Sequence, residues 1–307
     1  MYIEECPEVA QELLQQAIGR RHDRKPGWHQ SDVNQCLRKS VVDRWLREEA
    51  PPASGYPKGL RHLDYDYRLD LKFLRGEGMH NFFSEGKPEF VQYDPNLGWY
   101  SIDRVWEEGV TLRLSDGRVY HMDAVPMELK TTDYSMTKPV PEMMTYLTQI
   151  ATYTIKWVRY QLPDLSDDDI GECDLHAYLY IYHNRGDYKG NMPDHRAFKI
   201  TWRGTELLEW EAELTRRHTQ LDRSYGDLVV GSREDWGGLP NSFDDFDAPH
   251  ISDHYGFECD AYGRCPLKDM MGCQGTEASA AWDRVPFGLD GVAYMNPVKE
   301  SKPKGGK

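Results

Sequence analysis

Residues 110–132, VTLRLSDGRVYHMDAVPMELKTT, contain a turn signal between two segments that alternate as β-strands do. Asp116-Gly117 is one of the dipeptides that most strongly favour a two-residue hairpin turn. The alternation after the turn places Glu128 and Lys130 on one face of a strand, opposite to their apolar neighbours. An acid and an amine so placed form either a solvent-facing charge pair or part of a buried site.

The hairpin predicts which residue lies beside this pair. If the turn has two residues, Ser115 pairs with Arg118, and continued pairing places Asp103 opposite Lys130, one or two residues from Glu128. A bulge in either strand would shift this register by one step. Metal-dependent phosphodiester cleavage uses such groups, because carboxylates hold the ion and an ammonium positions a water or offsets negative charge.

Composition limits the class of protein. The chain has 307 residues, of which 39% are hydrophobic and 29% charged, as in a soluble globular protein. It has no apolar run as long as a membrane span and no signal-peptide pattern at its start, so we expect a cytoplasmic protein with reduced thiols and no membrane association. The net charge of −14 argues against a protein that coats nucleic acid generally, but it is compatible with a nuclease that has a local basic groove.

Periodicity and turn signals predict the order of elements. We expect helices at 7–18, 31–49, 66–85, 141–160 and 205–223, and strands at 89–93, 99–106, 110–115, 118–132, 174–183 and 196–202. Ser31 is the predicted cap of the second helix, with Cys36 in its second turn. We divide the chain into an N-terminal helical segment, a core, a cysteine-rich segment and a disordered tail, at 1–60, 61–225, 226–294 and 295–307.

Several polar residues on these elements are candidates for a site, although each has an ordinary alternative. His80 lies in the third predicted helix, where a packed or surface role is common. Gln149 and Tyr153 are four residues apart and share a helix face, which surface residues also do. A basic run, Arg20, Arg21, Arg24 and Lys25, is either a solvated surface or a phosphate contact.

The cysteines predict a metal or cluster site. Cys259, Cys265 and Cys273 have the spacing C-x5-C-x7-C, and glycine and proline residues between them allow tight bends. Three thiolates leave a tetrahedral site incomplete, so a fourth ligand is required, for which Cys36 is the best candidate. A cytoplasmic environment disfavours disulfides, and the spacing does not decide between zinc and an iron–sulfur cluster.

Taken together, these residues resemble the RecB-like branch of the PD-(D/E)XK nucleases. The similarity is greatest to its iron–sulfur members among CRISPR-adaptation exonucleases, AddB-type helicase-nuclease subunits and phage recombination exonucleases. It covers about residues 28–275 and consists of five motifs in the family's order. They are Gly76-Glu77-Gly78-Met79-His80, Ser101-Ile102-Asp103, Glu128-Leu129-Lys130, Gln149-Ile150-Ala151-Thr152-Tyr153, and one early cysteine with three late ones.

The resemblance implies an α/β (α+β) fold, with a restriction-endonuclease-like core in which helices flank a central mixed sheet. A four-cysteine iron–sulfur subdomain would join the N- and C-terminal segments. It implies a DNA exonuclease that uses Mg²⁺ or Mn²⁺ and acts on single-stranded or end-containing DNA in recombination, repair or CRISPR-type adaptation, as a homo-oligomer or within a larger complex. The implied metal ligands are His80, Asp103, Glu128 and the carbonyl of Leu129. Lys130, Gln149 and Tyr153 would orient water or phosphate, and Cys36, Cys259, Cys265 and Cys273 would hold a 4Fe–4S cluster.

Three features depart from the family pattern. The late cysteines are spread more widely than the family's C-x2-C-x5-C, which keeps zinc as an alternative, and Ser101 replaces a frequent glycine. Asp123 in Tyr120-His121-Met122-Asp123-Ala124 also resembles the family's G-H-x-D signature and competes with Asp103. We favour Asp103, because a hairpin from Asp123 to Glu128 would have Val-Pro at its centre.

A second class of function uses the same fold without catalysis. The protein would then be a DNA-binding or adaptor module in a larger DNA-processing complex, and a zinc-stabilised interaction domain is a third class. The presence of every acidic and basic position of the metal site favours an enzyme. Aromatic residues, namely Trp28, Trp99 and Tyr100, are candidates for stacking single-stranded bases.

Overall fold

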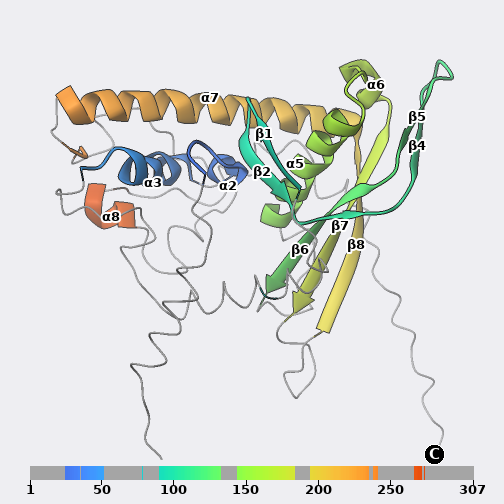
Figure 1. The fold of residues 1–307 in the computed structure, drawn as a ribbon, viewed down its shortest axis with the longest axis horizontal. Coiled ribbons are helices and arrows are strands. Elements are labelled where there is room, and N and C mark those ends of the chain that lie inside the picture. The colour runs from blue at the N-terminus through green and yellow to red at the C-terminus, as the bar shows by residue number, and fades with distance from the viewer. Residues whose placement is uncertain are drawn as a thin grey trace, which may run out of the picture.

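The structure of the protein is a computed structural model that describes residues 25–34, 36–51, 78, 90–132, 144–183, 194–234, 238–240, 266–271 and 273. The helices expected at 7–18 and 66–85 lie outside these residues, apart from Gly78, which is helical, and so does the tail at 295–307. Helix α7 (Gly204–Glu234) is the longest described element and runs along one side of the molecule (Figure 1).

A four-stranded mixed sheet forms the centre of the fold. Its order is β3-β6-β7-β8, with bounds Arg104–Trp106, Val125–Thr132, Asp174–His183 and Asp194–Arg203. Strands β6 and β7 are parallel, whereas the other neighbours are antiparallel. Parallel neighbours need a crossover, which helices α5 (Met144–Gln161) and α6 (Asp167–Gly171) supply. The predicted α/β class, with a central mixed sheet and flanking helices, is confirmed.

Alternation along β7 sets the buried face of the sheet. Leu175, Ala177, Leu179 and Ile181 are fully buried in one core cluster with apolar residues of α5 and α7. Burial on this face accounts for the apolar side chains at alternate positions of β7. The two helices are also joined by a hydrogen bond, because the indole Nε1 of Trp210 donates to Oγ1 of Thr152 at 2.9 Å.

The β4–β5 hairpin has a different turn from the predicted one. Strands β4 (Val110–Arg113) and β5 (Val119–Met122) pair Arg113 with Val119, and the N–H of Leu114 donates to the carbonyl of Arg118 at 3.0 Å. The loop therefore has three residues and includes Ser115, with Gly117 at φ +89°. A three-residue loop that ends on a left-handed glycine matches the strand twist, so the predicted two-residue turn was wrong by one residue.

Two of the predicted strands are divided by bends. The segment at 99–106 forms β2 (Gly98–Ile102) and β3 in different sheets, separated by a bend at Asp103, and β2 pairs with β1 (Phe90–Asp94). The segment at 118–132 forms β5 and β6. The carbonyl of Ala124 between them accepts a hydrogen bond from Nε1 of Trp157 at 2.8 Å, so it does not continue the ladder.

The helix predicted at 31–49 is interrupted. Helices α2 (Gln30–Asn34) and α3 (Leu37–Glu48) are separate, and Cys36 between them has φ −57° and ψ 116°, outside the helical region. At the start of α2, the side chain of Asp32 accepts the N–H of His29 at 2.9 Å, in place of the predicted cap at Ser31. Cys36 is therefore the residue before a helix and not part of a second turn.

Helix α3 packs along the C-terminal half of α7. Nε1 of Trp45 donates to Oγ of Ser232 at 3.0 Å, and Nε1 of Trp28 donates to Oδ1 of Asp222 at 2.6 Å. Helix α8 (Pro266–Met271) adds buried Leu267 to the same core cluster. None of the helices within the described residues combines the length and the apolar character that crossing a bilayer requires.

Candidate functional site

Two carboxylates meet where β3 joins the sheet. Glu128 lies on β6, between β3 and β7, and its side chain is 0% exposed. Arg104 pairs with Met127, so Asp103 lies opposite Glu128 and not opposite Lys130 as predicted. The bend places Oδ2 of Asp103 at 2.9 Å from the backbone N–H of Leu129, which donates to it. The predicted fold-back is therefore correct, and its register is shifted by two residues.

Burial and charge both act on Glu128. Removal from water raises its pKa well above the usual value, and the neighbouring charge of Asp103 raises it further. Among the described residues, no donor makes a hydrogen bond of normal geometry to either oxygen of Glu128. Its ion-pair partner is the ammonium of Lys130, two residues along the same strand face. The buried site thus brings two carboxylates, Asp103 and Glu128, close to the ammonium of Lys130.

Lys130 reaches the edge of this buried site. Its side chain is 20% exposed, and its ammonium lies 5.6 Å from the ring centroid of Tyr146 on α5. Burial alone would lower the pKa of Lys130, but the charges of Glu128 and Asp103 outweigh it and raise the pKa. Lys130 is therefore an ammonium at neutral pH, and it can donate to an anionic ligand from the rim of the site.

Helix α5 supplies the polar face that lies over β6. Nε2 of Gln149 donates to the hydroxyl of Tyr153 at 2.8 Å, so the predicted pair is in direct contact. Tyr146 precedes Gln149 by three residues and Tyr153 by seven, which places all three along one helix face. Tyr146 was not singled out from the sequence, although the same spacing pattern would have found it. The contact of Tyr146 with Lys130 connects this face to the carboxylates.

The rival Asp123 lies apart from these groups. It occupies the bend between β5 and β6 and is exposed. Asp103 is the carboxylate whose charge raises the pKa of Glu128. Geometry therefore brings Asp103, and not Asp123, to the Glu128–Lys130 pair.

Two of the four predicted cluster ligands can be located. Cys36 precedes α3 and Cys273 follows α8, both are buried, and neither is in a disulfide. Nη1 of Arg38 donates to Sγ of Cys273 at 3.6 Å, which brings the last of the three late cysteines to the start of α3. Cys173, in contrast, donates to the carbonyl of Asp169 next to β7, and it belongs to another part of the fold.

Some predicted ligands lie outside the described part of the chain. His80, Cys259 and Cys265 are among them, so their distances to the other candidates are not defined. Among the residues that the structure does describe, no three His, Cys, Asp or Glu side chains form a metal-binding group. The donor chemistry of the Asp103–Glu128 pair nevertheless fits a divalent cation, because such an ion would relieve the charge on a buried carboxylate to which no described residue donates with normal geometry.

Comparison with known proteins assigns no function. No family model matches the chain, and no curated protein matches it significantly. A solved structure, described as "Crystal structure of SSO0001", aligns over 68% of this chain and 86% of its own, with 9% identity and a TM-score of 0.32. A TM-score this low does not establish a shared fold, so the site must be interpreted from its own geometry.

Proposed function

We propose that the protein is a divalent-metal-dependent deoxyribonuclease with a restriction-endonuclease-like core of the RecB-like PD-(D/E)XK type. The observation that carries the proposal is the buried Glu128 carboxylate, crowded by Asp103 and followed on the same strand face by Lys130. Structural ion pairs rarely place two carboxylates beside one ammonium at a fully buried position, because that arrangement costs stability. A role of these carboxylates in binding a cation would explain why this loss of stability is retained.

Asp103 and Glu128 would hold a Mg²⁺ or Mn²⁺ ion through their oxygens, which are the ligands that these hard ions prefer. The family resemblance adds His80 and the carbonyl of Leu129 as further ligands, and a histidine would shift preference towards Mn²⁺. When bound, the ion supplies an activated water and offsets charge on the scissile phosphate.

The remaining side chains have roles that follow from their charge and position. Lys130, held as an ammonium by its two acidic neighbours, would donate to a non-bridging phosphate oxygen or orient the attacking water. Tyr146 would limit the directions that the Lys130 ammonium takes. Gln149 and Tyr153 would present an amide and a hydroxyl to the phosphate or to Lys130 from the facing helix.

The same proposal includes a structural cluster. Cys36, Cys259, Cys265 and Cys273 would hold a 4Fe–4S cluster, with zinc as the alternative occupant, and would join the two end segments of the chain. The proposal is supported by the contact of Cys273 with Arg38, two residues after Cys36. Closing a loop of more than 200 residues in this way reduces the entropy of the unfolded chain.

Degradation of end-labelled DNA tests the catalytic part. Wild-type protein with Mn²⁺ should degrade linear single-stranded or end-containing DNA and leave a circular substrate intact, as an exonuclease does. Glu128→Gln and Lys130→Ala should remove the activity. Glu108→Gln is the matched control, because this acid is held by Tyr178 and Lys199, and Tyr178 pairs with Met127 on the sheet face opposite to Glu128. Activity retained by Glu128→Gln would overturn the assignment.

Metal analysis of anaerobically purified protein tests the cluster. Iron and visible absorption that disappear in Cys36→Ser, but persist in Cys173→Ser, would support thiolate ligation of an iron–sulfur cluster. A colourless protein with stoichiometric zinc would replace the cluster by a zinc site.

A non-catalytic DNA-binding or adaptor module is the second candidate. It predicts DNA binding that Glu128→Gln leaves unchanged, with no hydrolysis in any divalent metal. The raised pKa of the buried Glu128 favours the enzyme, because an adaptor gains nothing from a destabilising carboxylate pair.

A further inference from the structure

The β1–β2 hairpin presents aromatic surface outside the core. Its strands pair Tyr93 with Trp99 and Val91 with Ser101, so these four side chains share one side, which we name the hairpin face. Tyr93 is 54% exposed and Val91 is 42% exposed. The opposite side of β2 carries Tyr100 and Ile102, which are buried. The earlier candidates Trp28 and Tyr100 are therefore core residues, and of the three only Trp99 remains for stacking.

Hydrogen bonds to the segment before α2 hold Trp99 in position. Its backbone N–H donates to the carbonyl of Trp28 at 2.8 Å, and its indole Nε1 donates to the carbonyl of Pro26 at 3.1 Å. Gly98 has φ +86°, and a Cβ there would lie 2.3 Å from the Trp28 carbonyl oxygen, so this close approach requires glycine. The indole is thus held rigidly on the hairpin face.

Packing within the protein does not explain why Tyr93 is placed on the hairpin face. Its ring meets Trp99 edge-on, with centroids 5.2 Å apart and an interplanar angle of 61°, and most of its surface remains in contact with solvent. More than half of the surface of Tyr93 therefore remains available for contact with a ligand. Such a ring next to a fixed indole is suited to receive a planar ligand.

The charge next to these rings is positive. The ammonium of Lys25 lies 3.9 Å from the ring centroid of Trp99, and in the sequence Lys25 ends the basic run that contains Arg20, Arg21 and Arg24. Asp94, the acid at the end of β1, is paired with buried Lys156 at 2.8 Å. Because the whole chain has a net charge of −14, the Lys25 ammonium beside these rings is a local positive charge that complements a phosphate.

The hairpin face leads directly to the metal-site candidate. Trp99 precedes Asp103 by four residues, of which Asp103 is the bend directly after β2, so their Cα atoms are separated by about 13 Å or less. A polynucleotide that contacts the hairpin face can therefore extend along β2 to the Asp103–Glu128 pair.

We propose that the hairpin face, together with Lys25, is a stacking platform for the unpaired bases of single-stranded DNA. Bases would stack on Tyr93 and beside Trp99, while Lys25 contacts a phosphate. The inference rests on the proposed nuclease function and specifies its substrate, because the bases of an intact duplex do not offer their faces to such a platform. Stacking of this kind is tolerant of sequence.

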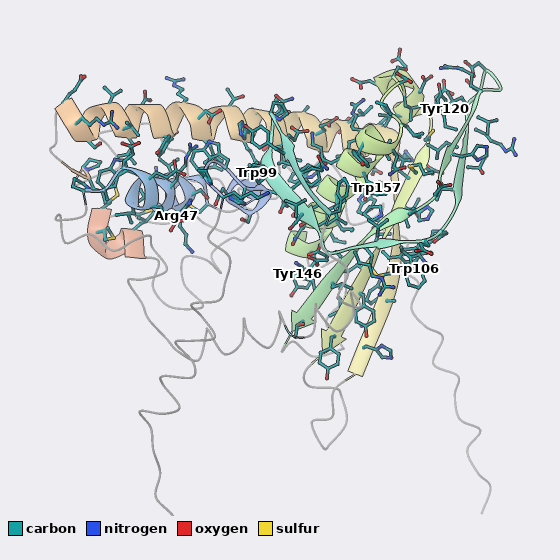
Figure 2. The ribbon with its side chains drawn as sticks, viewed as in Figure 1. Arg47, Trp99, Trp106, Tyr120, Tyr146 and Trp157 are labelled. Atoms are coloured by element: carbon teal, nitrogen blue, oxygen red, sulfur yellow. The ribbon has the colours of Figure 1, made fainter. Side chains whose placement is uncertain are left out.

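Binding measured without catalysis tests the platform. Fluorescence anisotropy of labelled oligo(dT) is recorded in EDTA with full-length wild-type protein and with Tyr93→Ser. The variant should bind about 5- to 100-fold more weakly, while Tyr93→Phe stays near wild type. Trp106→Ala is the matched control, because Trp106 is also an exposed aromatic residue, at 41%, but lies in another part of the molecule (Figure 2).

A second variant tests the phosphate contact. Lys25→Gln should reduce the slope of log affinity against log salt concentration by about 0.7, the value for one phosphate contact to a single strand. Tyr93→Ser should leave this slope unchanged, since it removes stacking and no charge. An unchanged slope in Lys25→Gln would overturn the assigned role of Lys25.

The outcomes separate this inference from the proposed function. Weaker oligo(dT) binding by Tyr93→Ser supports the platform even if no metal supports hydrolysis, in which case only the nuclease assignment fails. Hydrolysis with unchanged oligo(dT) binding by Tyr93→Ser overturns the platform and retains the nuclease. Absence of oligo(dT) binding by wild type, equal weakening for a blunt duplex, or a change of oligomeric state in Tyr93→Ser without a binding change also overturns it.

Discussion

Replacing Glu128 with glutamine should stabilise the metal-free protein while it removes activity. Glutamine has nearly the same shape but no charge, so it relieves the burial of a carboxylate beside Asp103. Lys130 is the ion-pair partner of Glu128 but does not offset its burial beside Asp103, and an incompletely satisfied buried acceptor costs about 1–3 kcal/mol, and more when it is charged. For a chain of this size, that gain corresponds to a rise in Tm of roughly 2–10 °C in EDTA at pH 8.

The pH dependence of this effect has a definite sign. Folding raises the pKa of Glu128, so the folded state favours the protonated carboxyl group. The stability associated with this group is fully present below the unfolded pKa, about 4.3, and is lost as the pH rises through the folded pKa. The advantage of Glu128→Gln should therefore be small in acid and grow with pH. Thermal unfolding at several pH values in EDTA measures it.

Addition of Mn²⁺ should reverse the order of stability. A ligand at 100 times its Kd stabilises the folded state by about 2.7 kcal/mol, and the wild type should gain this stabilisation while Glu128→Gln gains little. Glu108→Gln provides a control in which the change in stability has the opposite sign. A hydrogen bond from Tyr178 lowers the pKa of Glu108, so loss of the Glu108 charge should destabilise the protein at pH 8. A glutamine variant at position 128 that is less stable than wild type in EDTA would refute the reasoning.

Two further predictions concern which aspartate, Asp103 or Asp123, serves the metal site, and the buried ion pairs of Lys156. Asp103→Asn should reduce Mn²⁺-dependent hydrolysis of linear DNA by about 100-fold or more, whereas Asp123→Asn should stay within a few-fold of wild type; the reverse order in the same assay would assign the site to Asp123. Lys156→Ala should lower the unfolding free energy by about 3–5 kcal/mol, since Lys156 is buried between Asp94 and Glu211, and urea denaturation would measure this loss.

The approach of Asp103 to Glu128 and Lys130 could be predicted from the sequence, because it depends on strand alternation and on one turn. Glu128 and Lys130 share a strand face wherever that strand lies, and the hairpin signal returns the chain antiparallel to bring Asp103 near them. One residue of the register error came from Ser115, which joined the loop and made it three residues long, and the second arises between the β4–β5 and β3–β6 ladders. Turn residues alone do not distinguish these two loop lengths when both accept a glycine with positive φ.

Other features depend on contacts between distant parts of the chain, which sequence patterns do not contain. The helix break at Cys36 and the burial of Trp28 arise where α2 and α3 pack against α7. Similarly, the bend that divides β2 from β3 at Asp103 occurs because the two strands pair in different sheets. Tyr146 was missed for another reason, since its spacing was visible but an isolated tyrosine on an amphipathic helix has many ordinary roles.

Helix α7 imposes a constraint on insertions and deletions. Its 31 residues span about 46 Å without interruption, and it contacts α5 through Trp210 near its start and α3 through Ser232 near its end. Each residue added between these positions rotates one end relative to the other by about 100°. A single inserted residue would therefore turn one contact surface away from its partner, whereas an insertion of seven would leave a rotation of only about 20°. The length of α7 is thus permitted to change only in steps close to whole turns.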